Sequence, residues 1–504
     1  MHPTPIICFV LIRLYQSFYS SIPKGLVFSS VLLLSACASV VYEQPTDDIN
    51  SLMAAHWHEP LPHHGELANL KTWWAQFDDP LMLQLIADAQ QVSPTLAQAV
   101  ANIADARAAV VTSRAALLPS LDGSLNAERS RSDISASPIN LTSAGLQASW
   151  ELDIFGANSA AAYATSARLA SSQADWHDAR ILVAAEVATT YTELRACEAK
   201  VQQYQQDATS RINTSRLTKL SVKAGFRPPA AADLATASAA QGKMILVQQQ
   251  TQCDLLIKAL TALTAQDETA LRHDLAAANA MLPEAAALTV ASVPAEVISQ
   301  RPDIYAAARE VNAASADANE AQAQRWPRIT LSGNISASSM KTSGVSTDGS
   351  TWSIGPVAIT VPLFDGGSRR ANAEAARIRY DVSITIYAAR LREAIQEVEN
   401  ALVTLQSTAT RSMDADIAET GFERSFQATE SSYKAGIASL FDLEDARRSL
   451  ISAKTNSIEL QRERIASWIA LYRAVGGGWN ATELQQITNF PQNTIHRQSK
   501  AAGA

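Results

Sequence analysis

Two carboxylates near the C-terminal end of the sequence are the first candidates for chemistry. Asp442 and Asp445 are three positions apart at the start of a predicted helix, and side chains at that spacing share one helix face. A purely structural alternative is also open, in which Asp442 caps the helix and Asp445 completes an acidic first turn. The two roles are compatible, so the spacing does not separate them.

Other residue clusters offer less chemistry. A proline-rich arm carries four histidines without a defined scaffold for a metal: His56, His58, His63 and His64. Gly476-Gly477-Gly478 follows a predicted helix and lacks the lysine of a phosphate-binding loop, so we interpret it as a helix stop. The sequence has no GxSxG, HExxH or GxGxxG arrangement. We therefore expect no enzyme, no cofactor and no metal site.

The composition argues against a nucleic-acid partner and favours long helices. Over 504 residues the net charge is −8, and no block of Lys or Arg interrupts the acidic balance. Aromatic residues make up 6% of the chain, whereas Ala, Gln and Ser are abundant in its middle. Small, strong helix formers favour long helices in close contact over a bulky globular core.

The N-terminal segment predicts export and lipid attachment. Lys24 precedes an apolar run, Gly25 to Ala36, that is too short to span a membrane and suits a signal sequence. The run leads into Leu34-Ser35-Ala36-Cys37, which resembles a bacterial lipobox and predicts a covalent lipid on Cys37. A plain secretory signal with a chance cysteine is the alternative. Because Ala38 is not Asp, the resemblance to sorted lipoproteins indicates the outer membrane.

After Cys37 the sequence offers no run of about 18 apolar residues, so a crossing of the bilayer would have to use strands. Two later cysteines, Cys197 and Cys253, fall on predicted helices on either side of a turn at Lys223. We place them 27 and 20 residues from the ends of that turn. The mismatch is roughly 10 Å along the helix axis, so we expect buried thiols rather than a disulfide.

The chain is duplicated. Lys223-Ala224-Gly225 recurs as Lys434-Ala435-Gly436, at an offset of 211 residues. Farther upstream, Pro94 and Pro119 match Pro302 and Pro327 at an offset of 208. Each proline pair encloses an alanine-rich periodic segment, which predicts a helix in each half.

Each half continues with two predicted strands and one very long helix. Apolar residues alternate with polar ones in four segments, Leu121–Ala127, Leu146–Ile154, Ile329–Ala337 and Val357–Leu363. Loops rich in Ser, Gly and Asp, 130–140 and 338–350, separate the strands of each pair.

The long helices follow the strands. Residues 157–224 contain neither Gly nor Pro, and 368–420 repeats this until Gly421 breaks it. Heptad spacing in the first helix predicts coiled-coil packing, and antiparallel partners are expected to return from Asp233 and Asp442. Four strands cannot hide their edges from lipid, so several chains must close the sheet together.

Five motifs carry a resemblance to a known family. They are the paired turns, Arg301-Pro302-Asp303, Leu363-Phe364-Asp365-Gly366-Gly367, Asp442-Leu443-Glu444-Asp445-Ala446, and the segment Leu471 to Trp479. From about Trp73 to Trp479 the chain resembles the outer-membrane efflux channel family, the TolC-like proteins. The cysteine and the final Gly-Gly-Gly-Trp resemble its lipoprotein branch, the NodT type, which serves resistance-nodulation-division pumps.

The resemblance implies a mostly α fold with a transmembrane β-barrel. A homotrimer would combine four strands per protomer into a twelve-stranded barrel in the outer membrane, and long antiparallel coiled-coil helices would form an α-barrel in the periplasm. The expected organisation is a signal peptide (1–36), a lipid-anchored arm (37–72), two channel repeats (73–290 and 291–479) and a polar tail (480–504).

The resemblance also assigns roles at the turns. Lys223-Ala224-Gly225 and Lys434-Ala435-Gly436 would form the periplasmic tip. Asp442 and Asp445 match aspartates that ring an aperture, where crowded carboxylates favour cations and have raised pKa values. Tyr433 matches a tyrosine of the gate's hydrogen-bond network, although an ordinary packed aromatic fits as well.

One part of the gate departs from the family pattern. Asp233 matches an aspartate that latches neighbouring helices, but the position of its usual arginine partner is Ala438 here. Lys434 and Arg227 are the available substitutes.

The function implied is a passive outer-membrane exit duct for small molecules in a tripartite efflux pump. Its partners would be a periplasmic adaptor, an inner-membrane resistance-nodulation-division transporter and outer-membrane lipids. Two alternatives remain, a channel for type I protein secretion and a structural coiled-coil lipoprotein that forms no channel.

Overall fold

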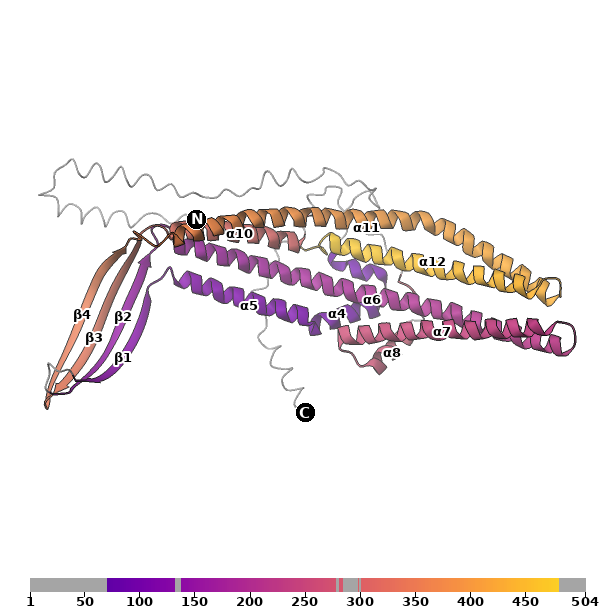
Figure 1. Cartoon of the computed structure of the whole chain (residues 1–504), viewed down its shortest axis with the longest axis horizontal. Helices are drawn as coiled ribbons and strands as arrows, with labels where there is room; N and C mark the ends of the chain where they lie inside the picture. The colour runs from indigo at the N-terminus through magenta and orange to yellow at the C-terminus, as the bar shows by residue number, and fades with distance from the viewer. Residues whose placement is uncertain (1–69, 132–136, 278–280, 284–297, 299–300, 480–504) are drawn as a thin grey trace. The chain divides into compact units, whose positions relative to one another are not determined.

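The structure is a computed structural model, which describes residues 70–131, 137–277, 281–283, 298 and 301–479 (Figure 1). The fold is mostly helical, with four antiparallel strands. Its elements are the 3-10 helix η2 (Leu70–Phe77), α4 (Pro80–Val92), α5 (Pro94–Ala115), β1 (Ser120–Ser130), β2 (Ile139–Leu152), α6 (Ala157–Lys223), α7 (Pro229–Thr264), α8 (Glu268–Ala277), α10 (Pro302–Ala323), β3 (Arg328–Thr342), β4 (Val345–Thr360), α11 (Ser368–Lys434) and α12 (Leu440–Ala474).

The duplication predicted from the sequence is visible in the order of elements. In each half a 22-residue helix, α5 or α10, precedes two strands and a 67-residue helix, α6 or α11. A shorter helix, α7 or α12, then returns along the long one, as the contacts between them show (Figure 1). At 1.5 Å per residue each long helix measures about 100 Å.

Gly421 interrupts the stretch without Gly or Pro but does not end the helix, because α11 continues through this residue to Lys434, at its Lys-Ala-Gly turn. A glycine inside a helix costs only about 1 kcal/mol relative to alanine, and a helix this long carries that cost. Gly421 is exposed, and a Cβ built there would meet no atom within 4 Å. The residue therefore marks neither a turn nor a close helix contact.

The strands form one antiparallel sheet in the order β1-β2-β3-β4. The second predicted loop, 338–350, is wrong, since β3 and β4 extend through most of it and leave only Ser343 and Gly344 between them. Both residues have positive φ, 49° and 82°, which is what a two-residue hairpin turn with the twist of its strands requires. The alternation of apolar and polar residues predicted strands that are too short, because Ser and Thr occupy the ends of β3 and β4 next to their turn.

The sheet has one apolar face and one polar face. Its register places Gly123, Leu146, Ile335 and Trp352 in one row across the four strands. The next row along the strands contains polar side chains throughout: Asp122, Gln147, Asn334 and Ser353. Successive side chains of a strand point to opposite faces, so the two rows lie on opposite sides. The apolar face is exposed, and Trp352 keeps 75% of its surface accessible.

The long helices pack side by side in a fixed order. α6 contacts α7 and α12, and α11 contacts α12. The largest core cluster joins η2, α4, α6, α7 and α12 through buried apolar side chains, which include Trp73, Leu85, Tyr191, Leu260 and Trp468. Within the described part of the chain, no helix combines the length and apolar character needed to cross a membrane.

The expectation of two free thiols is wrong, since Cys197 and Cys253 form a disulfide with their Cα atoms 5.6 Å apart. The error lies in the assumed start of α7, which begins at Pro229 rather than at Asp233. Proline is favoured at the first position of a helix, so the residues before Asp233 are helical. Counted from the observed helix ends, the two cysteines are nearly level, and the bond joins α6 to α7.

Candidate functional site at the hairpin tips

The two Lys-Ala-Gly motifs end the long helices in the same way. Gly225 and Gly436 have positive φ values of 78° and 80°. The following amides, of Phe226 and Ile437, donate to the carbonyls of Ser221 and Ser432 at 2.9 Å in both cases. This pattern is a helix C-terminal cap, in which glycine adopts the left-handed conformation without a Cβ penalty. The repeated motif thus has a local cause, two equivalent turns between antiparallel helices.

Both turns expose large apolar side chains. Phe226 and Ile437 each retain 83% of their accessible surface, and Phe441 is also exposed. Sequence reasoning passed over these residues, although an apolar residue directly after a turn glycine is a usable signal. Exposed apolar groups at a loop tip are typical of a contact surface.

Asp442 and Asp445 both lie on the exposed side of α12. Ser439, rather than Asp442, is the N-cap, and Asp442 completes a capping box. The amide of Ser439 donates to Asp442 Oδ2 at 2.8 Å, and the amide of Asp442 donates to Ser439 Oγ at 3.2 Å. The Ser439 hydroxyl also donates to Asp442 Oδ2, at 2.6 Å. The bonds donated to the carboxylate by this hydroxyl, the largest cause, and by the Ser439 amide lower the pKa of Asp442. Asp445 forms an ion pair with Arg448.

Tyr433 is buried where the two hairpins meet. Its hydroxyl oxygen lies 2.8 Å from that of Thr218 on α6. The ring packs with Ala235, Leu440 and Leu443, and the guanidinium of Arg227 lies 4.2 Å from its centroid. Within one chain Tyr433 is therefore both a packed aromatic and a hydrogen-bonding side chain, and its part in a gate stays a prediction.

Within one chain the latch expected at Asp233 is not formed. Asp233 is exposed, and it has no ion pair or side-chain hydrogen bond with any other described residue. Of the two substitutes, Lys434 pairs with Glu430 at 3.0 Å, and Arg227 covers the Tyr433 ring. Lys434 is thus engaged within its own helix, whereas Arg227 of the first turn contacts the second hairpin.

A buried ion cluster missed by the sequence joins the hairpins instead. It consists of Asp207 and Arg211 on α6 and Glu444 and Arg447 on α12. Arg211 Nη1 donates to Glu444 Oε2 at 2.9 Å, and Arg211 Nε donates to Asp207 Oδ2 at 2.8 Å. Ser238 on α7 donates to the same Glu444 oxygen at 2.6 Å.

Arg447 is the most buried member, with 2% of its surface exposed. Its Nη1 donates to Glu444 Oε1, and its Nη2 donates to the hydroxyls of Ser210 and Thr214 at 3.1 Å each. Burial raises the pKa of Asp207, and Arg211 and Arg447 oppose that shift. The only sequence signals were the helix spacings within each half of the cluster, four residues from Asp207 to Arg211 and three from Glu444 to Arg447.

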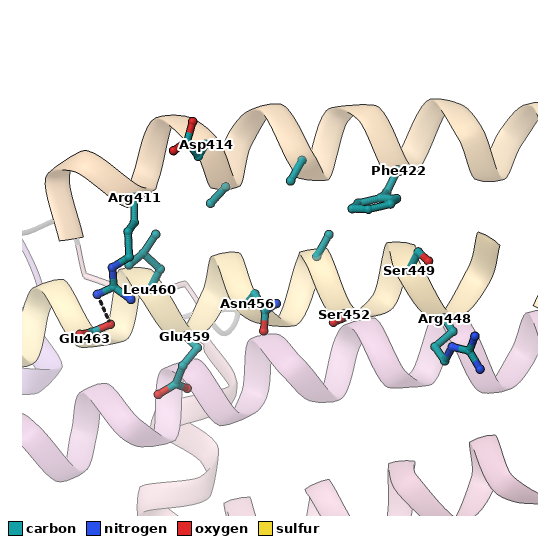
Figure 2. Close-up of a pocket in the computed structure, with 13 residues that line it drawn as sticks. Arg411, Asp414, Phe422, Arg448, Ser449, Ser452, Asn456, Glu459, Leu460 and Glu463 are labelled. Carbon is teal, nitrogen blue, oxygen red and sulfur yellow. Dashed lines mark hydrogen bonds and ion pairs between the residues drawn. The ribbon is translucent and has the colours of Figure 1, made fainter. Parts of the chain in front are cut away.

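A groove of about 770 Å³ runs between α11 and α12, farther from the turns (Figure 2). Arg411 and Glu463 bridge it at one end through a 2.7 Å ion pair, and Phe422 lines it toward the other. Small side chains form much of its wall: Ala415, Ala418, Ser449, Ser452 and Ala453. Among the described residues, no group of His, Cys, Asp and Glu could hold a metal ion. Cys37 and the histidines at positions 56–64 lie outside the described residues.

Known proteins of similar sequence are outer-membrane and nodulation proteins. The solvent efflux pump outer membrane protein SrpC of Pseudomonas putida is 27% identical over 487 residues, covering 91% of this chain and 99% of that protein. Nodulation protein T of Rhizobium leguminosarum bv. trifolii is 28% identical over 419 residues, covering 81% of this chain and 88% of the relative.

A solved structure and a family description agree with these relatives. The open state of the MtrE outer membrane channel of Neisseria gonorrhoeae superposes with a TM-score of 0.72 at 25% identity, covering 87% of this chain and 98% of that one. The family described as outer membrane efflux protein matches residues 85–266 and 293–477, one segment in each half of the duplication. The chain therefore belongs to the outer membrane efflux protein family.

Proposed function

We propose that this protein is the outer-membrane exit duct of a tripartite efflux pump and works as a homotrimer. The observation that carries the proposal is the four-stranded sheet, which has one exposed apolar face and one polar face. In the described fold, β1 and β4 are edge strands, each with a neighbour on one side only. Exposed edges of this kind do not persist in lipid. Three copies, joined β1 to β4, give a closed sheet of twelve strands with the apolar face toward lipid and the polar face toward water.

The helices support the same assembly. The packing order leaves α7 and α11 at the two sides of the helical layer. Each carries exposed apolar side chains along its length: Met244, Val247 and Leu255 on α7, and Val403, Met413 and Ile417 on α11. In the proposed trimer α7 of one protomer packs against α11 of the next, which removes these side chains from water.

Anchoring and partners complete the proposal. A lipid on Cys37 attaches the arm 37–72 to the outer membrane, and the two repeats 73–290 and 291–479 extend into the periplasm from there. The exposed apolar tips are the surface for a periplasmic adaptor protein, and an inner-membrane transporter of the resistance-nodulation-division type supplies the energy. The relative named for solvent efflux supports small molecules as the cargo.

The aperture is the acidic face of α12. In a threefold assembly, Asp442 and Asp445 contribute six carboxylates around the axis. A ring of carboxylates attracts cations and repels anions. The exposure of both side chains supports this role, and the capping box keeps Asp442 ionised by lowering its pKa.

The test is the conductance of the purified trimer in a planar bilayer. We compare the wild type with Asp442→Asn/Asp445→Asn, because asparagine at position 442 still accepts the hydrogen bonds of Ser439 while the charge is lost. The expected wild-type current is small and cation-selective, and the double variant loses selectivity. Asp414→Asn/Asp416→Asn on α11 is the matched control, with the same change in charge away from the tip.

Each outcome separates one part of the proposal. A conducting wild type with an unchanged tip variant keeps the duct and reduces Asp442 and Asp445 to helix caps. The absence of conductance from folded wild-type trimers contradicts the duct and favours a structural lipoprotein.

A further inference from the structure

Besides the contacts of Tyr433 with Thr218 and Arg227, the ion cluster joins the two hairpins within a chain. Glu444 accepts hydrogen bonds from Arg211 on α6 and from Ser238 on α7. Its second oxygen accepts from Arg447, whose other nitrogen reaches Ser210 and Thr214 on α6. One side of the first two turns of α12 is therefore fixed to both helices of the first hairpin.

The opposite side of the same two turns carries the aperture carboxylates. At 3.6 residues per turn, Glu444 and Arg447 point about 160° away from Asp442 and Asp445. The burial pattern agrees, since Arg447 is buried, Glu444 half-buried, and both aspartates exposed. Whatever fixes the rotation of α12 about its axis also fixes the direction of the acidic face.

We propose that Glu444 and Arg447 are positioning residues of the aperture, which anchor α12 to α6 and α7 and so set the direction of Asp442 and Asp445. The cluster takes the place of a latch built from exposed tip residues. This inference rests on the proposed duct, because only a duct gives the acidic face a function. A movement of α12 along α6 breaks the bonds of Glu444 to Arg211 and Ser238 together, so the cluster favours a single closed arrangement.

Because the ion cluster is buried, separating its members is costly, and this cost favours the closed arrangement of α12 against α6 and α7. Removing one member of a buried ion pair leaves its partner's charge without compensation, which is strongly unfavourable. Asp207 Oδ1 and Arg447 Nε already lie 3.8 Å apart, and neither has a hydrogen-bond partner among the described residues. These atoms interact only through their charges, so Asp207 depends on the arginines for its ionised form.

The experiment uses trimers of the full chain in planar bilayers. The variants are Arg447→Met, which removes the central cation at similar length, and Ser238→Ala, which removes one hydrogen bond to Glu444 with little risk to folding. Arg411→Met is the matched control, because the Arg411–Glu463 pair joins α11 to α12 within one hairpin. We expect a several-fold larger closed-state conductance and weaker cation selectivity for Arg447→Met, a smaller change of the same sign for Ser238→Ala, and wild-type behaviour for the control.

Selectivity is the decisive readout, since general loosening of the helices raises conductance without redirecting the carboxylates. If Arg447→Met and Ser238→Ala keep the wild-type conductance and ion selectivity, the positioning role is wrong and the duct stands. If Arg447→Met yields no trimer, the closed-state conductance and ion selectivity of Ser238→Ala test the positioning role.

A silent wild type contradicts the duct, and hydrogen exchange then tests the anchor alone. Amides of residues 440–450 are expected to exchange faster in Arg447→Met than in Arg411→Met, and equal rates overturn the anchor itself.

Discussion

The hydroxyl oxygen of Tyr433, at the end of α11, lies 2.8 Å from that of Thr218, near the end of α6. This contact joins the two long helices of the duplication directly. Thr218 also donates to the carbonyl of Thr214 at 2.8 Å, so Tyr433 is the natural donor toward Thr218. The contact thus depends on the tyrosine hydroxyl, whereas the packing of the ring depends on Ala235, Leu440 and Leu443.

Tyr433→Phe removes this hydrogen bond and keeps the ring. We expect the contact between α6 and α11 to weaken by about 1 kcal/mol, with a measurable rise in closed-state conductance. Tyr387→Phe, a half-buried tyrosine on the same helix, is the control and should leave the current unchanged. An equal effect of both variants would show that the hydroxyl contact at Tyr433 has no special part in closure.

The disulfide between Cys197 and Cys253 should stabilise the first hairpin. It closes a loop with a sequence separation of 56 residues that contains the first tip turn. In the chain-entropy model a loop of this size contributes about 4 kcal/mol. We expect Cys197→Ala/Cys253→Ala to lower the midpoint of thermal unfolding, and a reductant to lower that of the wild type but not of the variant. An identical response of both proteins to reductant would contradict this account.

The long elements were predictable because local patterns determine them. The absence of Gly and Pro predicted α6 almost to the residue, and alternation located β1, β2 and β3 but only the last four residues of β4. Gly421 did not end α11, which continues to its Lys-Ala-Gly turn. The strand ends around Ser343 and Gly344 misled because polar residues replace the alternation there.

The tertiary partners were not predictable in the same way. The disulfide depends on where α7 begins. Because the helix starts four residues before Asp233, Cys253 lies almost level with Cys197 and the two can form a bond. The ion cluster pairs Arg211 with Glu444, which are 233 residues apart. No local spacing reports such a pair, since it exists only once α12 has packed against α6. The sequence therefore predicted the turns and the helix ends but missed the contacts between the hairpins.

Asp178 gives the protein a predicted pH dependence of stability. Burial, with help from the nearby Asp303, raises the pKa of this carboxyl to about 6, from 3.8 as a free side chain. The folded protein thus binds this proton more tightly than the unfolded chain. The contribution of Asp178 to stability is largest below about pH 4, falls as the pH rises to about 6 and stays constant above that. We expect Asp178→Asn to flatten this part of the stability profile and to raise the unfolding midpoint at pH 8.

The measurement is the midpoint of thermal unfolding of the detergent-solubilised trimer between pH 4 and pH 8. Asp274→Asn, at an exposed position on α8, is a control that should leave the profile unchanged. A wild-type profile that is flat from pH 4 to pH 6, or equal in Asp178→Asn, would contradict the assignment.

The two faces of the sheet should respond differently to charge. Trp352 lies in the apolar row and Ser353 in the polar row, next to each other on β4. In the proposed assembly Trp352→Arg places a charge toward lipid, at a cost of about 2–4 kcal/mol near the middle of the bilayer, and Ser353→Arg places the same charge toward water. We expect Trp352→Arg to reduce the amount of heat-modifiable trimer in outer-membrane fractions and Ser353→Arg to leave it near the wild-type level. Because the two positions are adjacent, a difference in distance from the turn does not explain such a contrast. Equal losses would indicate that neither face meets lipid, and a loss with Ser353→Arg alone would reverse the orientation of the sheet.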